Sequence, residues 1–210
     1  MRFRLFSVPE GTATWRVLTA LVLVFLPFSL FSAGLLTLTR IVFNPGGASV
    51  GESLHILGSV LSSGILHELG HWAAAGPGVR ISAITTTPGM ATVRIRFSPE
   101  PAAGSPRWVR MMLGGAAANL LLAGTLLALH PRLGTWAMYY IFLHLLTAGL
   151  NLVPFRTAAT GPTDGWLLWQ GLRGRLAVGN GGASVFKVHS DHSAMKGGAD
   201  HGEGADEEAL

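Results

Sequence analysis

The sequence predicts a membrane protein of the all-α class, with about four transmembrane helices and a short β-hairpin between the second and the third. Of its 210 residues, 49% are hydrophobic and only 12% are charged, whereas soluble domains average about 25% charged residues. The mean hydropathy is +0.44, and long apolar segments recur along the chain. A soluble domain with so few charged side chains could not cover its surface with them.

The charge and the cysteine content exclude several kinds of site. The chain has a net charge of +4 and a pI near 10.3, but its arginines stand in ones and twos at the ends of apolar segments. That placement is typical of charges that orient membrane helices, so we expect no nucleic-acid partner. Because there is no cysteine, disulfides, thiolate zinc ligands and cysteine nucleophiles are excluded. Any metal must be bound by His, Asp or Glu.

The first apolar segment, residues 17–39, has no charged residue and is long enough to cross a hydrocarbon core of about 30 Å. Three arginines precede it and only Arg40 follows it closely, which favours a cytoplasmic amino terminus. A secretory signal peptide is the alternative interpretation, but its apolar region would be only about 7–15 residues long. We therefore expect a retained helix.

The second apolar segment, 53–75, is unusual because it carries four ionisable residues, which are His55, His67, Glu68 and His71. Ionisable groups in a membrane span are costly and usually mark a functional site. The third segment, 108–129, is rich in Gly and Ala, which lets helices approach closely. The fourth is 135–153, and the later segment 165–172 is too short to span and is expected at the membrane interface.

Residues 76–107 separate the second segment from the third and break the helical pattern. Segments 79–84 and 91–97 alternate as strands do, and Pro88-Gly89 suits a turn between them. The region is basic through Arg80, Arg94, Arg96 and Arg107. We therefore expect it in the cytoplasm, together with the amino terminus.

This organisation predicts a cytoplasmic segment 1–16, a transmembrane domain 17–175 and a disordered polar tail 176–210, which is rich in Gly, Asp and Glu. We expect a multi-pass integral protein of the bacterial plasma membrane. The tryptophans stand near the ends of the apolar segments, as an aromatic belt would place them. They are Trp15, Trp72, Trp108, Trp136, Trp166 and Trp169.

The segment His67-Glu68-Leu69-Gly70-His71 matches the motif HExxH. Side chains four residues apart share one face of a helix, so both imidazoles can reach one metal ion. Glu68 points about 100° away, near enough to take a proton from metal-bound water, whose pKa zinc lowers toward about 7. Two hydrogen-bonded core histidines are the simpler alternative. Inside an apolar segment, however, these groups need a compensating partner, and a cation supplies it. We expect this cation to be zinc, one ion per chain.

A catalytic zinc ion usually has three protein ligands and one open position. Asp164 is the only acidic residue between Glu100 and Asp191, and it follows the fourth segment at its cytoplasmic end. The second segment runs from outside to inside, so His67 and His71 also lie toward the cytoplasm. The alternative interpretation of Asp164 is a turn residue before glycine.

Other polar residues are weaker candidates. His55 lies about 18 Å from His67 along a helix, too far for the same metal ion. His144 is expected to be a buried, hydrogen-bonded histidine, and Asn119 to make an interhelical hydrogen bond. The tail also has groups that could bind metal weakly, namely His189, Asp191, His192, Asp200 and His201.

These motifs together resemble the site-2 protease family of intramembrane zinc metalloproteases. The resemblance covers about residues 50–170 and keeps the family's order, with HELGH, then Gly115-Ala116-Ala117-Ala118-Asn119, then Asn151-Leu152-Val153-Pro154 and Asp164-Gly165. It implies that Asp164 is the third zinc ligand. It also implies that Asn151 lies beside the metal, where its amide could steady the substrate or a developing oxyanion. The family often has proline at the position of Ala116, and its usual spacing would place the aspartate five residues earlier. A longer loop at 157–163 can absorb that difference.

We therefore expect an enzyme, a zinc metalloendopeptidase that cuts a membrane-spanning protein substrate in or next to its transmembrane segment, with Glu68 as general base. The alternative is a divalent-metal-binding membrane transporter, which would place ligands at several depths. A catalytically inactive scaffold is a third class, against which the presence of Glu68 argues. The substrate must be locally unwound, and the hairpin could offer it an edge for strand addition or only order the loop.

Overall fold

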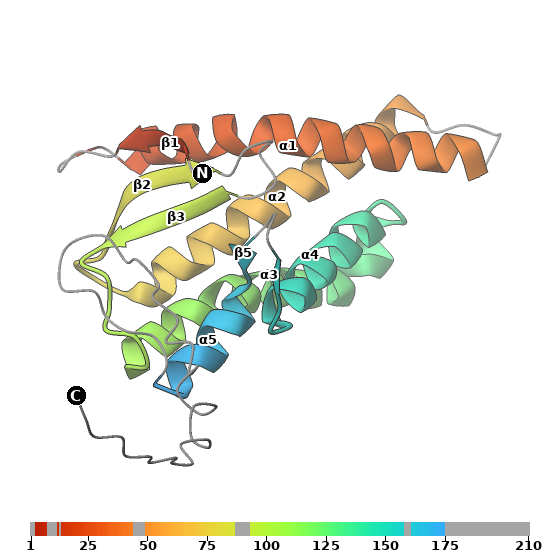
Figure 1. Cartoon of the computed structure of the whole chain (residues 1–210). Coiled ribbons are helices and arrows are strands. Elements are labelled where there is room, and N and C mark those ends of the chain that lie inside the picture. The colour runs from red at the N-terminus through yellow and green to blue at the C-terminus, as the bar shows by residue number, and fades with distance from the viewer. Residues whose placement is uncertain are drawn as a thin grey trace, which may run out of the picture.

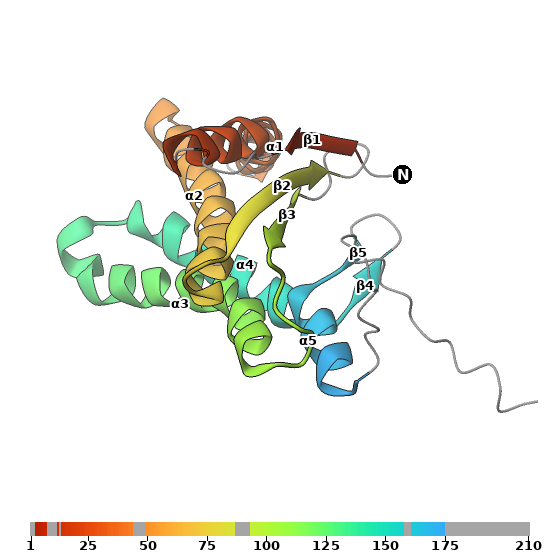
Figure 2. The same ribbon diagram turned by 90° about the vertical axis from the view of Figure 1, so that its left-hand side faces the viewer.

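The computed structural model describes residues 3–7, 12, 14–43, 49–86, 93–157 and 161–174. Within this part the protein is mostly helical, with two small antiparallel sheets (Figures 1 and 2). The helices are α1 (Thr14–Phe43), α2 (Val50–Ala75), α3 (Pro106–Leu133), α4 (Ala137–Leu152) and α5 (Asp164–Leu172). The strands are β1 (Phe3–Ser7), β2 (Arg80–Thr86), β3 (Val93–Ser98), β4 (Arg156–Thr157) and β5 (Gly161–Pro162). The predicted Pro88-Gly89 turn and the predicted disordered tail lie outside the described residues.

Capping residues set where three of the helices begin. At α2 a capping box forms, in which the Ser49 hydroxyl accepts from the Glu52 backbone N–H at 3.1 Å and the Ser49 N–H donates to the Glu52 carboxylate at 2.9 Å. Ser105 caps α3, whose first residue is Pro106, and Thr163 caps α5. Each of these helices begins before the apolar segment that predicts it, because satisfying the free N–H groups of the first turn extends the helix toward the cap.

Two of the four predicted membrane segments form helices whose length and apolar composition allow them to cross a membrane, α1 and α3. A core helix of a soluble protein and a signal sequence can have the same two properties. Helix α4 is apolar but has 16 residues, fewer than the about 20 that usually span a bilayer. Helix α2 has 26 residues and carries the ionisable side chains noted above. The number of spans therefore stays a prediction.

The predicted hairpin between the second and third segments is confirmed, because β2 pairs antiparallel with β3. The structure adds β1, a strand from the amino-terminal segment that the sequence pattern did not predict. It pairs antiparallel with the other edge of β2, which makes the sheet order β1-β2-β3. The amino-terminal segment and the hairpin therefore lie at the same end of the helices (Figure 1).

Helix α2 is the centre of the packing, since it contacts α1, α3 and α4. The sheet packs against the first half of α1, where buried residues of α1 and β2 form one apolar cluster: Val17, Leu21, Val24, Phe25, Ile81 and Ile84. Helices α2 and α3 approach each other closely at Gly70 and Gly114. A Cβ on either glycine would collide with the backbone carbonyl of the other, so only glycine permits this crossing.

The prediction of a tryptophan belt is wrong for Trp108. Its side chain is buried in a second apolar cluster with Ala75, Met111 and Leu167. A Cβ at Gly171 of α5 would lie 2.5 Å from the Trp108 ring, so α5 lies directly over this indole. The physical reason is that α5 folds back onto the start of α3 and covers the ring. This contact joins segments far apart in the sequence, so the position of Trp108 at the start of an apolar segment does not predict it.

Candidate metal centre

The three residues predicted to bind metal lie together. His67 and His71, one turn apart on α2, are 5% and 4% exposed, and Asp164 is the first residue of α5. Oδ2 of Asp164 is 2.9 Å from Nε2 of His67 and 3.1 Å from Nε2 of His71, and the two Nε2 atoms are 3.1 Å apart. Bonds of about 2.0–2.1 Å in a tetrahedral zinc site put ligand atoms about 3.3 Å apart. The spacing of these three groups fits such a site.

The hydrogen bonding of His71 determines its protonation pattern. Nδ1 of His71 lies 2.6 Å from the backbone carbonyl oxygen of Met111 on α3. A carbonyl only accepts, so Nδ1 carries the hydrogen, and the neutral ring has its lone pair on Nε2. That lone pair and the Asp164 carboxylate both point at Nε2 of His67. These acceptor groups need a partner between them, which is either a hydrogen on Nε2 of His67 or a metal ion bound by all three atoms.

Asp164 is ionised at neutral pH and is therefore available as a ligand. Burial by itself raises the pKa of the Asp164 carboxyl, but the charges and hydrogen bonds of His71 and His67 outweigh burial and hold this pKa below its ordinary value. A carboxylate and two imidazoles are a donor set that zinc accepts.

The connection from α4 to α5 brings Asp164 to the histidines. The Thr163 hydroxyl donates to the Val153 carbonyl at 2.7 Å, and the two-residue strands β4 and β5 pair with each other. A Cβ at Gly165 would collide with the Leu152 carbonyl, so α5 starts directly against the end of α4. The lengthened loop that the sequence predicts at 157–163 is thus partly a small hairpin, of which residues 158–160 lie outside the described part.

Gly115 of α3 forms the wall beside the ligand atoms. A Cβ there would lie 2.6 Å from Nε2 of His71 and 2.8 Å from Nε2 of His67. In the sequence this glycine belongs to a run of small residues and opens the second motif of the family resemblance. Its position against both imidazoles becomes apparent from the helix packing alone.

The two residues predicted to act in catalysis are placed differently. Glu68 follows His67 directly on α2 and is half-buried, close enough for its charge to act on the His71 ring. The Asn151 amide donates to the Thr147 carbonyl one turn earlier at 2.9 Å, and in the described part of the chain no hydrogen bond joins it to the three ligands. The role of Asn151 stays a prediction.

Two other histidines of the helices, His55 and His144, lie as expected. His55 stacks on the Trp136 ring, with centroids 5.2 Å apart, and meets Tyr140 edge-on, so it is separate from the metal centre. His144 is buried and hydrogen-bonded to Asn119 at 2.6 Å, which also confirms an interhelical bond for Asn119. The weak metal ligands considered in the tail lie beyond the residues that the structure describes.

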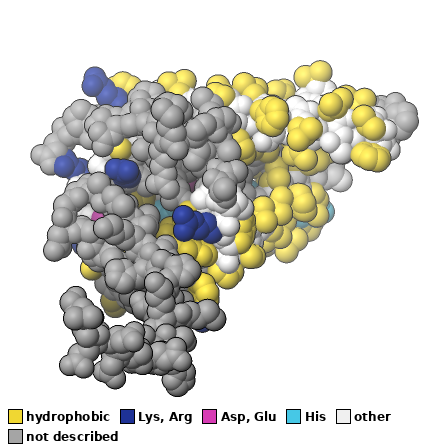
Figure 3. All heavy atoms as spheres, viewed as in Figure 1, with side chains coloured by type: hydrophobic (Ala, Val, Ile, Leu, Met, Phe, Trp, Pro, Cys, Tyr) yellow, Lys and Arg dark blue, Asp and Glu magenta, His cyan; other side chains and the backbone are white. Residues whose placement is uncertain are grey.

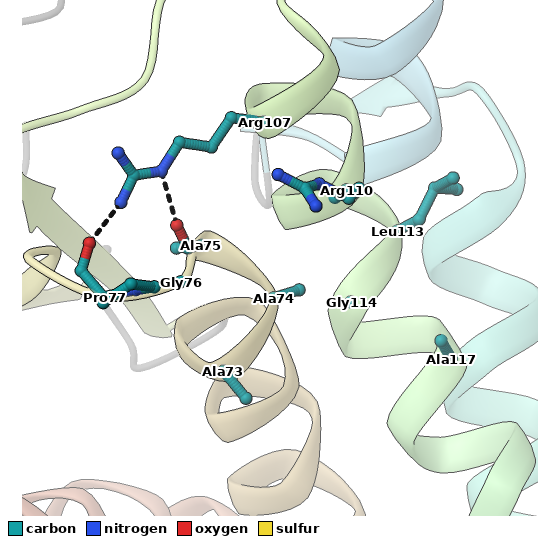
Figure 4. A pocket seen from close by; sticks show the side chains of 10 residues that line it. All are labelled: Ala73, Ala74, Ala75, Gly76, Pro77, Arg107, Arg110, Leu113, Gly114 and Ala117. Carbon is teal, nitrogen blue, oxygen red and sulfur yellow. Dashed lines mark hydrogen bonds between the residues drawn. The ribbon is translucent and has the colours of Figure 1, made fainter.

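A pocket of about 690 Å³ lies between the end of α2 and the first turns of α3 (Figure 4). Its lining residues include neither a histidine nor an acidic residue. The Arg107 side chain spans its upper edge and donates to the carbonyls of Ala75 at 2.6 Å and Pro77 at 2.5 Å. This contact ties the end of α2 to the start of α3. The pocket is therefore distinct from the candidate metal centre.

Comparison with protein-family models, with curated proteins and with solved structures gave no match.

Proposed function

We propose that this chain is an intramembrane zinc metalloprotease that hydrolyses a peptide bond in or next to the transmembrane segment of a membrane-tethered protein. The observation that carries this proposal is that one possible ligand atom from each of His67, His71 and Asp164 lies within 4.8 Å of the others, with both histidines buried and Asp164 half-buried. Glu68 on the same helix turn adds the general base. Among the described residues this is the one group of metal-binding side chains, whereas a transporter would need ligands at several depths.

Large apolar side chains exposed on the helices support a membrane location. They stand out along α1, α3 and α4, for example Leu23, Phe31 and Phe43 on α1, Leu121 on α3 and Phe142 on α4, which are between 57% and 83% exposed. Figure 3 shows apolar side chains gathered over the helical part and basic side chains toward the end where the sheet lies. Exposing such an apolar surface to water costs free energy, whereas exposing it to lipid does not. We therefore propose several membrane spans.

The residues of the chain would divide the chemistry as follows. His67, His71 and Asp164 would hold the zinc ion, which supplies an acidified water and polarises the scissile carbonyl when bound. Glu68 would take a proton from the attacking water as its oxygen bonds to the carbonyl carbon. When the C–N bond breaks, Glu68 would return that proton to the leaving amine. Burial of both histidines would limit access of bulk water to the reacting groups.

The sheet supports one way of holding an extended substrate. The sequence pattern suggested that the hairpin could offer an exposed edge, and β1 covers the far edge of β2. Of the two hairpin strands, β3 is therefore the one whose outer edge could receive a substrate by strand addition, while β1 forms the other edge of the described sheet. A hairpin that only orders the loop stays the alternative.

Replacing Asp164 tests the metal centre directly. Purified wild-type protein should contain about one zinc ion per chain, as a single three-ligand site requires. Asp164→Ala should lower that content sharply, because it removes the charged ligand. His55→Ala, a change to a histidine on the same helix but outside the centre, should leave it unchanged. Metal analysis by mass spectrometry makes the comparison. Unchanged zinc in the Asp164 variant would mean that another residue is the ligand.

Labelling of single introduced cysteines tests the topology, and the absence of native cysteine keeps the background low. Ala102→Cys lies between β3 and α3, and Thr135→Cys lies in the α3–α4 connection at the opposite end of the helices (Figure 1). Both residues are exposed. In intact cells an impermeant thiol reagent should label position 135 and not position 102, because the basic hairpin region is expected in the cytoplasm. The reverse result would contradict the proposed orientation.

A further inference from the structure

On the side of His67 away from Asp164, buried polar side chains from three helices form a chain of contacts. Nδ1 of His67 lies 3.4 Å from the amide nitrogen of Asn119 on α3, and the amide oxygen lies 2.6 Å from Nδ1 of His144 on α4. Nε2 of His144 lies 3.2 Å from the hydroxyl oxygen of Ser62, back on α2. Asn119 and His144 are 0% exposed. Bulk water therefore cannot replace a missing partner at either residue.

Metal binding places a requirement on this chain of contacts. A neutral imidazole has one N–H and one lone pair, so Nε2 of His67 can bind a metal ion only when the hydrogen is on Nδ1. A buried N–H needs an acceptor. Among the described residues, the Asn119 amide is the group within hydrogen-bond distance of this nitrogen. The amide oxygen and nitrogen have almost the same shape, so the surrounding hydrogen bonds decide which of them faces His67.

One self-consistent arrangement leaves Nε2 of His67 free. The Ser62 hydroxyl donates to the Ser59 carbonyl at 3.2 Å, so its oxygen accepts from the Nε2–H of His144. Nδ1 of His144 then has the lone pair and accepts from the amide N–H of Asn119. The amide oxygen consequently faces His67 and accepts from its Nδ1–H, which leaves the lone pair on Nε2 for the metal ion.

The opposite arrangement is also self-consistent and blocks the site. If the Ser62 hydroxyl donates to Nε2 of His144, each following hydrogen bond reverses, and the amide nitrogen of Asn119 donates to Nδ1 of His67. The hydrogen of His67 is then on Nε2 and donates to Oδ2 of Asp164, 2.9 Å away. An amide serves both arrangements because it accepts on one side, donates on the other and exchanges the two by turning over.

We propose that Asn119 and His144 are positioning residues that hold His67 in the tautomer whose Nε2 binds the metal ion. This inference rests on the proposed metal centre and names the side chains that hydrogen-bond to one of its ligands. Hydrogen bonds to the second nitrogen of a metal-bound histidine typically change metal affinity by about 10- to 100-fold when they are removed. The chain also joins α2, α3 and α4, so it couples the packing of these helices to the orientation of the ligand.

Two replacements of Asn119 separate hydrogen bonding from packing. Asn119→Leu keeps a similar volume but offers no acceptor, and it should weaken zinc binding by about 10- to 100-fold. Asn119→Asp keeps acceptor oxygens facing both histidines, and it should retain zinc binding close to the wild type. Ser63→Ala is the matched control, because the Ser63 hydroxyl donates to the Val60 carbonyl on α2 at 2.9 Å, outside the chain of contacts. It should leave zinc binding unchanged.

The measurements are the zinc dissociation constant, from competition with a chelator, and the visible absorption spectrum of protein loaded with Co²⁺. The spectrum should change in Asn119→Leu and resemble the wild type in Asn119→Asp. Wild-type affinity in Asn119→Leu, or an equal loss in both variants, would overturn the proposal. If Asn119→Leu does not fold, His144→Leu takes its place, with weaker zinc binding and a changed spectrum expected. Wild-type protein that binds no metal would instead contradict the metal centre itself.

Discussion

Replacing Gly115 by alanine is expected to remove zinc and to lower hydrolysis by about 100-fold or more, while the protein still folds. The added methyl group would lie 2.6 Å from Nε2 of His71 and 2.8 Å from Nε2 of His67. These atoms are at the ends of side chains, so the imidazoles, and not the helices, would move aside. A shift of about 1 Å in a catalytic arrangement can cost about 100-fold in rate. Zinc content, hydrolysis and thermal unfolding, measured on one preparation, check this prediction.

Gly124→Ala is the matched control on the same helix. A Cβ at Gly124 meets nothing within 4 Å, and alanine in a helix interior is about 0.5–1 kcal/mol more favourable than glycine. This variant should keep the zinc content and activity of the wild type. If Gly115→Ala also kept its zinc, the metal ion could not lie between the two imidazoles where α3 passes them.

Glu68→Gln is expected to keep its zinc and to lose nearly all hydrolysis. Glutamine preserves the size and polarity of the side chain but cannot take a proton, and general-base catalysis typically contributes about 10²–10⁴-fold. The assay would use a model substrate with a single transmembrane segment weakened by Gly, Pro or Asn, since an intact helix shields its peptide bonds. Zinc content is measured alongside the rate.

Glu52→Gln provides the comparison, because Glu52 is also on α2 but lies at its first turn, paired with Arg40 at 2.8 Å and hydrogen-bonded to Ser49. Its loss should affect the start of the helix and leave the hydrolytic rate close to the wild type. Activity near the wild-type level in Glu68→Gln would exclude the proton-transfer role. Loss of zinc in that variant would show that Glu68 is a ligand.

The parts of the site that could be predicted from sequence are those that depend on neighbouring residues. His67 and His71 share a helix face because helical periodicity acts over four residues, and the hairpin follows from its alternating pattern. Asp164 could be identified from sequence for a different reason, because it is the only acidic residue in a long stretch of the chain. The capping box at Ser49 and Glu52 is also local, so the earlier start of α2 could have been found from sequence.

Contacts between distant segments were decided by the tertiary structure. Asp164 reaches His67 across 97 positions of the chain, and this needs the small hairpin after α4 and the glycine contact at Leu152. The pairing of β1 with β2, the burial of Trp108 and the wall at Gly115 have the same origin.

The hydrogen-bond partners of His67 and His71 show most clearly how the two kinds of information differ. Every residue has a backbone carbonyl, so nothing in the sequence marks Met111 as the acceptor for His71. Asn119 and His144 could be expected to form hydrogen bonds, but not to meet each other behind His67. Sequence determines which groups can bind metal through the chemistry of single side chains. The close crossing of α2 and α3 determines which hydrogen bonds orient these groups for metal binding. That crossing could not be predicted from sequence, because it depends on packing across the whole bundle.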